Sequence, residues 1–195
     1  FPSINITCIV EDQHGHLWIG TWDDGLIHFE PETGKTEHFK YRADVPGTIS
    51  SNGVWDIHIE NNGALLLSTF AGVDLFNPDQ KSGKQMFDDR GQFGDLAGST
   101  IRQTFRDKKG RLWIGTYDYH GLYLVDDRQG RISSFRMFRN EDDNEHSISM
   151  DRIRCIYEDS KGNMWIGTEN GLNKIPALQP FCQYTFMPRR PSSLG

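Results

Sequence analysis

Apolar and polar positions recur in the same order four times along the 195-residue chain. Each copy contains an apolar segment, a polar turn closed by glycine and a second apolar segment that ends in threonine. Turn and second segment form a heptapeptide, which reads GHLWIGT at 15–21, GALLLST at 63–69, GRLWIGT at 110–116 and GNMWIGT at 162–168. The turn glycines are therefore 48, 47 and 52 residues apart. A repeat of this length is typical of solenoids, propellers and other arrays.

The pattern within each copy predicts four short β-strands. The first segment is rich in β-branched and aromatic residues, which favour strands, and covers 6–12, 54–60, 101–107 and 153–159. After the heptapeptide, a third segment begins at a glycine followed by an aliphatic residue, and a fourth segment is aromatic. No stretch keeps a helical period. The sequence therefore predicts an all-β fold, a β-propeller whose four four-stranded blades cover roughly 1–48, 49–95, 96–147 and 148–193.

We interpret the heptapeptide as a packing element. An apolar run with little polar interruption indicates a strand buried on both faces, so Trp18, Trp113 and Trp165 are predicted to lie in the core. The glycine after the isoleucine is predicted to stand where a neighbouring blade or a large ring approaches closely. The threonines at 21, 69, 116 and 168 are predicted to hydrogen-bond the backbone at the strand end.

Composition narrows the possible function classes. The formal net charge is −6, the sequence pI is about 5.6 and no lysine or arginine run is present, which argues against a nucleic-acid-binding surface. The longest apolar run is far too short to cross a bilayer. His14 and His16 flank Gly15 and could share a metal ion, but no third ligand is evident. We therefore predict no metal site and no cofactor.

Further motifs accompany the heptapeptide. The first segments of copies one and four follow the pattern Ile/Val-x-x-Ile-x-Glu-Asp, which ends at Glu11-Asp12 and at Glu158-Asp159, and joint sequences stand at 46–52 and 144–149. The whole pattern resembles the two-component regulator propeller repeat. This resemblance implies the periplasmic sensor region of a hybrid two-component system of the Bacteroidetes type, which detects an oligosaccharide and signals to a histidine kinase. It also implies a seven-bladed ring, in which these blades would adjoin the remaining blades. Four blades alone would leave apolar faces exposed at both ends, so the alternatives are a small closed ring or pairing with a second copy of the chain. The kinase and the membrane segment would lie outside this sequence.

The repeat leaves variable positions on one predicted face. In a propeller the first strand of each blade lines the central channel, and the loop after the second strand opens on the face where the first strand begins. The candidate ligand-binding residues at these positions are Trp22, Asp23, Asp24, Trp55, Phe70, Arg102, Tyr117, Tyr119, His120, Arg154 and Glu169. Aromatic rings suit the C–H face of a pyranose, and both aspartate and arginine can hydrogen-bond to its hydroxyl groups. Arginine can also bind the carboxylate of an acidic sugar or a sulfate group. The alternative is packing, in which a ring such as Trp22 lies on a neighbouring blade and each arginine pairs with a nearby acid.

No catalytic residues are predicted. The neighbouring acid pairs lie in loops and do not form the opposed pair that glycoside hydrolysis needs. Two other functions stay open. One is a carbohydrate-active propeller enzyme of the polysaccharide lyase type, in which His120, Tyr119 and an arginine act on a uronate. The other is a structural propeller that docks a protein partner.

Overall fold

The computed structural model describes residues 5–87, 95–128, 131–144, 146–177 and 182–184, and sixteen strands form within these ranges. Blades 1 and 2 contain β1 (Ile6–Glu11), β2 (Leu17–Thr21), β3 (Leu26–Glu30), β4 (Lys35–Phe39), β5 (Val54–Ile59), β6 (Leu65–Thr69), β7 (Gly72–Asn77) and β8 (Ser82–Gln85). Blades 3 and 4 contain β9 (Ile101–Arg106), β10 (Leu112–Thr116), β11 (Leu122–Arg128), β12 (Arg131–Phe138), β13 (Ile153–Glu158), β14 (Met164–Thr168), β15 (Gly171–Ile175) and β16 (Cys182–Tyr184). No helix long and apolar enough to span a membrane occurs among the described residues.

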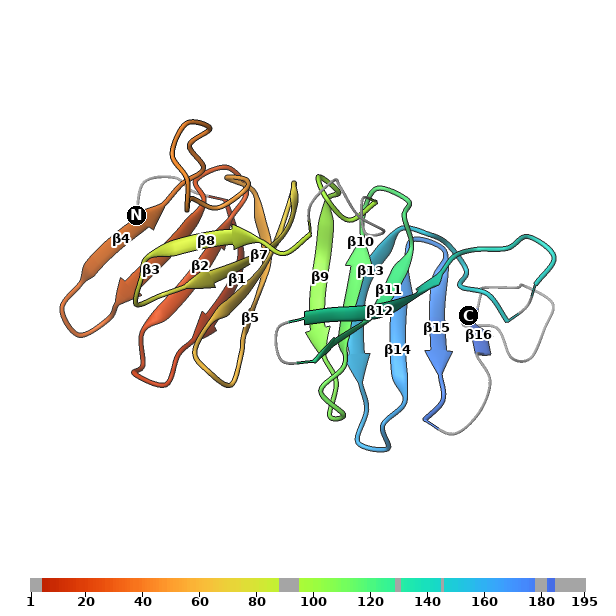
Figure 1. Cartoon of the computed structure of the whole chain (residues 1–195). Coiled ribbons are helices and arrows are strands. Elements are labelled where there is room, and N and C mark those ends of the chain that lie inside the picture. The colour runs from red at the N-terminus through yellow and green to blue at the C-terminus, as the bar shows by residue number, and fades with distance from the viewer. Residues whose placement is uncertain (1–4, 88–94, 129–130, 145, 178–181, 185–195) are drawn as a thin grey trace. The chain divides into compact units, whose positions relative to one another are not determined.

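Each blade is a four-stranded meander in which strands adjacent in sequence pair, in the order β1-β2-β3-β4 and its three equivalents (Figure 1). This is the architecture that the repeat predicted, so the all-β propeller fold is confirmed. The chain forms two compact units, Phe1–Thr104 and Phe105–Gly195, and the boundary between them falls within β9. The first unit contains blades 1 and 2, and the second contains most of blade 3 and all of blade 4.

Each unit has a core to which both of its blades contribute. The cluster in the first unit consists of Trp18, Leu26, Ile49, Val54, Ile57, Leu65, Leu67 and Phe76. The cluster in the second unit consists of Trp113, Leu122, Ile148, Ile153, Ile156, Met164 and Ile166. Trp18 and Trp113 are 4% and 1% exposed, as the repeat predicted, whereas Trp165 is only half-buried. The second strand of blades 1 and 3 thus joins its own blade to the next one.

An aspartate at the end of the first strand holds the following turn and the tryptophan together. Asp107 Oδ1 accepts hydrogen bonds from the backbone N–H groups two and four residues later, at 3.0 and 2.9 Å. Its Oδ2 accepts from Trp113 Nε1 at 2.9 Å. Asp12 and Asp159 make the same three contacts in blades 1 and 4. The glycine that closes each turn has φ between 76° and 81°, a conformation that glycine adopts without strain.

Blade 2 lacks both partners of this contact. Glu60 stands at the aspartate position and Leu66 at the tryptophan position. The turn contains Asn62, whose Oδ1 accepts from the backbone N–H of Ala64 at 3.1 Å. Leu66 is still 1% exposed, so the strand keeps its place in the core. Among the four blades the aspartate and the tryptophan occur together or not at all, which supports their acting as one structural unit.

Gly20 and the threonine after it have the predicted packing roles. A Cβ atom on Gly20 would lie 2.9 Å from the carbonyl oxygen of Val54 in the neighbouring blade, so glycine permits this close approach. Thr21 Oγ1 donates to the carbonyl of Gly25 at 2.8 Å and accepts from the backbone N–H of Asp24 at 2.9 Å. The threonines of the other blades make the same pair of contacts with their own loops. Their predicted backbone role is confirmed.

A buried polar side chain on the third strand fastens the joint that precedes its blade. In blade 4, Asn173 Oδ1 accepts from the backbone N–H of Ser149 at 2.8 Å, and Asn173 Nδ2 donates to the carbonyl of Ile166 at 3.1 Å. In blade 2, Asp74 Oδ2 accepts from the backbone N–H of Ser50 at 2.6 Å. Among the described residues, Asp74 Oδ1 has no hydrogen-bond partner. Asp74 is fully buried, and this burial raises its pKa.

The Asp107→Asn substitution is expected to lower the free energy of unfolding by about 1 to 3 kcal/mol, because an amide group cannot replace all of the accepting oxygens. Burial alone would raise the pKa of Asp107, but hydrogen bonds from Trp113 and Arg111 outweigh it and lower the pKa. The wild type should therefore lose this stability as the pH falls through the folded-state pKa. Urea unfolding followed by tryptophan fluorescence at neutral and acidic pH measures both effects. Asp142→Asn, at an exposed position, is the control. Equal stability of the two variants at neutral pH would contradict the role of Asp107.

The Asp74→Asn substitution is expected to stabilise the protein at neutral pH by about 1 to 3 kcal/mol. Asn173 shows that an amide at the equivalent position satisfies both of its polar atoms. Because the pKa of Asp74 is raised by folding, the wild type is most stable below the unfolded-state pKa and loses stability as the pH rises through the folded-state pKa. The advantage of the variant should thus grow with pH in thermal unfolding experiments. A variant less stable than the wild type at every pH would show that the interpretation is wrong.

Candidate functional site

Three aromatic rings from two blades meet in the first unit. Trp22 follows β2, Phe70 follows β6 and Trp55 is the second residue of β5. The ring centroids lie 4.9 Å apart for Trp22 and Trp55, 5.0 Å for Trp22 and Phe70, and 5.3 Å for Trp55 and Phe70. The guanidinium carbon of Arg102 lies 4.6 Å from the centroid of Trp55. We call these four residues the Trp22 cluster. The sequence predicted all four as candidate ligand-binding residues.

Backbone irregularities bring these side chains together. The pairing of β5 with β6 shifts register at Trp55, so this residue lies at a β-bulge, a distortion that redirects side chains and often accompanies functional sites. Phe70 packs directly on Gly53, where a Cβ atom would lie 2.6 Å from the ring. The backbone N–H of Phe70 also donates to the carbonyl of Gly53 at 3.1 Å. The ring of Phe70 is therefore fixed against the start of the inner strand.

Trp22 remains accessible within this cluster. Its side chain packs edge to face against the two rings of blade 2, yet the residue is 46% exposed. Trp55 and Phe70 are half-buried. One side of the indole therefore packs on the neighbouring blade, as the alternative interpretation predicted. Nearly half of the residue's surface is still open to a ligand. The cluster offers apolar ring surface and a cation at the same place.

Asp56 lies close enough to Arg102 to affect its electrostatics. Burial raises the pKa of Asp56 to about 6, against the opposing effects of the Arg102 charge and of backbone hydrogen bonds from Ile57 and Thr104. This carboxyl group therefore changes charge near neutral pH. At a pH above this pKa, Arg102 has a negatively charged Asp56 beside it, and at a lower pH Asp56 is neutral.

A second group of residues gathers in the second unit, and we call it the Arg152 cluster. The guanidinium carbon of Arg152 lies 4.7 Å from the ring centroid of Tyr117 and 4.0 Å from the ring centroid of Tyr119. The guanidinium carbon of Arg154 lies 4.9 Å from the ring centroid of Tyr117. Glu169 bonds both arginines, with Oε2 3.0 Å from Arg152 Nη1 and Oε1 accepting from Arg154. Tyr119 has φ of 68°, which is uncommon for residues other than glycine. Both arginines already have an acidic partner, as the packing alternative predicted.

Three predicted ligand residues belong to neither cluster. Asp24 accepts from Lys40 and lies 3.1 Å from His38 Nδ1, and these partners, Lys40 above all, lower its pKa. Asp23 is exposed in the same loop. His120 Nδ1 lies 3.6 Å from Asp118 Oδ1. The loop position of these residues was predicted from the repeat, but the direction of each side chain depends on its local partners.

Sequence analysis did not predict Arg152. It directly precedes the inner strand of blade 4, and the prediction considered only the second residue of each inner strand. The other blades have Asn5, Gly53 and Thr100 at this position. A large cation where the sister repeats have small or uncharged residues is the signal that could have identified it.

The sequence matches a known repeat family in three places. Residues 1–23, 95–118 and 147–170 match the profile of the family described as Two component regulator propeller. The corresponding part of blade 2, which carries Glu60 and Leu66, is not among the matched residues. No curated protein matches the chain significantly.

Solved structures share the fold. The chain superimposes over 97% of its length on the extracellular domain of the putative hybrid two component system BT3049 from B. thetaiotaomicron, with a TM-score of 0.71 and 23% identity, and spans 23% of that chain. The extracellular domain of the putative one component system BT4673 from the same organism gives a TM-score of 0.71 and 20% identity, over 89% of this chain and 22% of that one. Virginiamycin B lyase from Staphylococcus aureus gives a TM-score of 0.66 and 10% identity, over 98% of this chain and 58% of the lyase chain.

The chain therefore spans less than a quarter of the length of the two B. thetaiotaomicron chains. Their TM-scores of 0.71 establish a common fold. The aspartate turn, the heptapeptide and the blade topology agree with the three profile matches. The chain is a β-propeller array, and three of its segments match the two component regulator propeller repeat.

Proposed function

We propose that this chain is part of the periplasmic sensor region of a two-component signalling protein and binds an oligosaccharide at the Trp22 cluster. The sensor role is supported by the repeat family and by the fold shared with extracellular domains of two component systems. The histidine kinase and the membrane segment would belong to other parts of the protein. The observation that carries the ligand proposal is the exposed ring of Trp22, which packs on Trp55 of blade 2, whose ring in turn carries the guanidinium of Arg102.

The Trp22 cluster has the chemistry that sugars require. A pyranose has apolar C–H faces and polar hydroxyl edges, so a flat ring next to hydrogen-bond donors suits it. Trp22 is 46% exposed, and its indole is held in place by contacts with Trp55 and Phe70. A ring that is already fixed loses little conformational freedom when a ligand binds.

The arginines favour the Trp22 cluster over the Arg152 cluster as the site for an acidic or sulfated glycan. Arg152 and Arg154 share the carboxylate of Glu169, which an anionic ligand would have to displace. Arg102 instead lies over the ring of Trp55, and its acidic neighbour Asp56 becomes neutral below about pH 6. Its planar guanidinium can bind a carboxylate or sulfate through parallel hydrogen bonds.

The Trp22→Ala substitution is expected to weaken the binding of an acidic glycan about tenfold, or about 1.4 kcal/mol, because the platform for the sugar ring is lost. Isothermal titration with tetragalacturonate, a sulfated chondroitin tetrasaccharide and neutral cellotetraose measures this effect and the charge preference. Tyr41→Ala is the matched control, since Tyr41 is 47% exposed in the same unit and lies outside the Trp22 cluster. Equal loss of affinity in both variants, or none in either, would contradict the site.

The same titrations separate the two alternative functions. Conversion of tetragalacturonate to an unsaturated product that absorbs in the ultraviolet would favour a lyase. In that case His120→Ala and Tyr119→Phe should abolish the reaction. A protein that binds none of the glycans but associates with another protein through this face would favour a docking propeller.

Binding of tetragalacturonate is expected to tighten as the pH falls through about 6, because Asp56 then loses the negative charge that competes for Arg102. Uronate groups remain ionised in this range, so the ligand keeps its charge. The Asp56→Asn variant should bind at neutral pH as the wild type does at lower pH, with a weaker dependence on pH. An identical pH profile in the two proteins would show that Asp56 does not influence the site.

A further inference from the structure

Two histidines and an aspartate of blade 1 converge on one point. His16 Nδ1 and His28 Nε2 lie 3.1 Å apart, and their ring centroids are separated by 5.0 Å. The ligand atoms of Asp12, His16 and His28 all lie within 4.8 Å of one another. All three residues are half-buried. These nitrogen and oxygen donors are the ligand types found in zinc sites.

The fold holds these three side chains in position. His28 lies opposite Trp18 in the pairing of β2 with β3 and stacks on its indole, with a centroid distance of 4.4 Å and an angle of 29°. Trp18 Nε1 donates to Asp12 Oδ2 at 3.1 Å, and the backbone N–H of His16 donates to Asp12 Oδ1 at 3.1 Å. The three candidate ligands are thus fixed by the turn, by the strand register and by one shared tryptophan.

The sister blades use the same positions differently. Four residues after the aspartate, Arg111 Nε donates to Asp107 Oδ2 at 2.7 Å, and Asn163 Nδ2 donates to Asp159 Oδ2 at 2.8 Å. In blade 1 this position is His16, and its ring nitrogen faces a second imidazole instead. Opposite the tryptophan, blades 3 and 4 have Leu124 and Lys174, which offer no metal ligand. Among the described blades, only blade 1 places two imidazole nitrogens side by side.

The distances agree with a shared metal ion. Two nitrogens bound to one tetrahedral zinc ion at about 2.0 to 2.1 Å are separated by about 3.3 Å. The nitrogens of His16 and His28 are separated by 3.1 Å. Asp12 Oδ1 accepts two hydrogen bonds, whereas Oδ2 accepts one and keeps a second lone pair for a metal ion.

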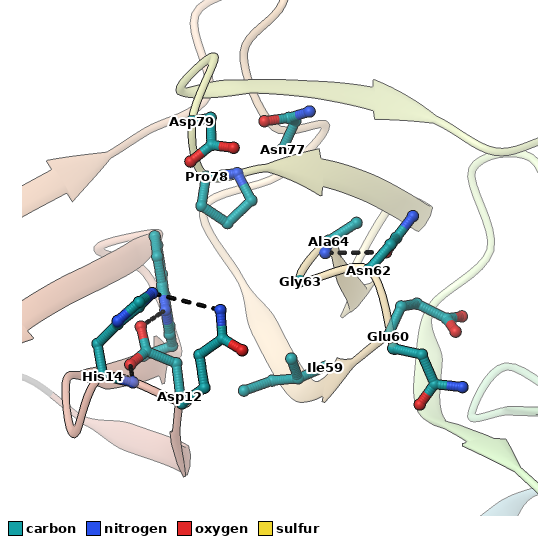
Figure 2. Close-up of a pocket in the computed structure, with 13 residues that line it drawn as sticks. Asp12, His14, Ile59, Glu60, Asn62, Gly63, Ala64, Asn77, Pro78 and Asp79 are labelled. Atoms are coloured by element: carbon teal, nitrogen blue, oxygen red, sulfur yellow. Dashed lines mark hydrogen bonds between the residues drawn. The ribbon is translucent and has the colours of Figure 1, made fainter.

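We propose that His16 Nδ1, His28 Nε2 and a carboxylate oxygen of Asp12 bind a divalent transition metal ion of the zinc class. Three protein ligands leave one position of a tetrahedral site open. Asp12 also lines a pocket of about 240 Å³, whose other walls include Glu60, Asn62 and Asp79 (Figure 2). Water or a ligand in this pocket therefore lies next to Asp12. The site is separate from the proposed glycan site.

The sequence places a different pair, His14 and His16, on either side of Gly15, and no metal site was predicted there. The ring centroids of these two residues lie 6.0 Å apart, and His14 Nε2 instead lies 3.3 Å from Gln13 Nε2. His14 is exposed at the turn, and Figure 2 shows it at the wall of the pocket. His14 is therefore a suitable control residue.

Isothermal titration of zinc chloride into the chelator-treated protein tests the proposal. The wild type should bind one equivalent of zinc, and zinc should raise its thermal unfolding midpoint, because only the folded state holds the ligands together. His16→Asn and His28→Leu copy the residues that blades 4 and 3 have at these positions, so the fold should tolerate them. Each variant should bind zinc at least about tenfold more weakly and lose the thermal shift.

His14→Ala should keep zinc affinity within about twofold of the wild type, because this residue is not a proposed ligand. Cobalt chloride should give the visible absorption bands of a tetrahedral site in the wild type and not in His28→Leu. Calcium chloride should not compete, since this hard cation prefers oxygen ligands. Absence of zinc binding in the wild type, or zinc binding that His28→Leu leaves unchanged, would overturn the proposal. So would loss of binding in His14→Ala alone.

Discussion

The contact between the aspartate at the end of the first strand and the indole of the following tryptophan is the constraint on which blades 1, 3 and 4 depend. In blade 3 the carboxylate of Asp107 orders the turn through two backbone N–H groups and also accepts the indole N–H of Trp113. That indole is 1% exposed and belongs to the core between blades 3 and 4. A buried indole N–H without an acceptor would cost the free energy of its desolvation. The turn geometry and the core between two blades are therefore coupled through one side chain.

This coupling leaves the loops on the opposite end of the strands free to differ. Each of these loops starts at a threonine and ends at a glycine, and the threonine hydroxyl bonds the glycine carbonyl across the loop. Between these two anchors the loop has three residues in blade 1, two in blades 2 and 4, and four in blade 3. Trp22, Phe70 and Tyr119 all lie in such loops. Binding residues can therefore change from one blade to the next without disturbing the packed strands.

The repeat made most of the fold predictable from the sequence, because each structural role is written several times. The strands, the turn glycines, the buried Trp18 and Trp113 and the threonine contacts all follow from positions that recur in phase. The sequence also placed Trp22, Trp55, Phe70 and Arg102 on one face, where the structure brings them together. It could not predict that Asp24 would bond Lys40, or that His28 would lie beside His16. These contacts occur once, and they depend on which residues the strand register places opposite each other.

The residue four positions after the aspartate shows how one scaffold position accommodates different chemistry. It is arginine in blade 3, asparagine in blade 4 and histidine in blade 1. The backbone N–H of this residue binds the aspartate in all three blades, whatever its side chain. The turn therefore imposes little restriction on the side chain, which lies beside an ionised carboxylate in every case. Arg111 and Asn163 add a further hydrogen bond to that carboxylate, whereas His16 faces the imidazole of His28. Because backbone atoms hold the turn, a new polar group can arise next to the carboxylate without loss of the blade.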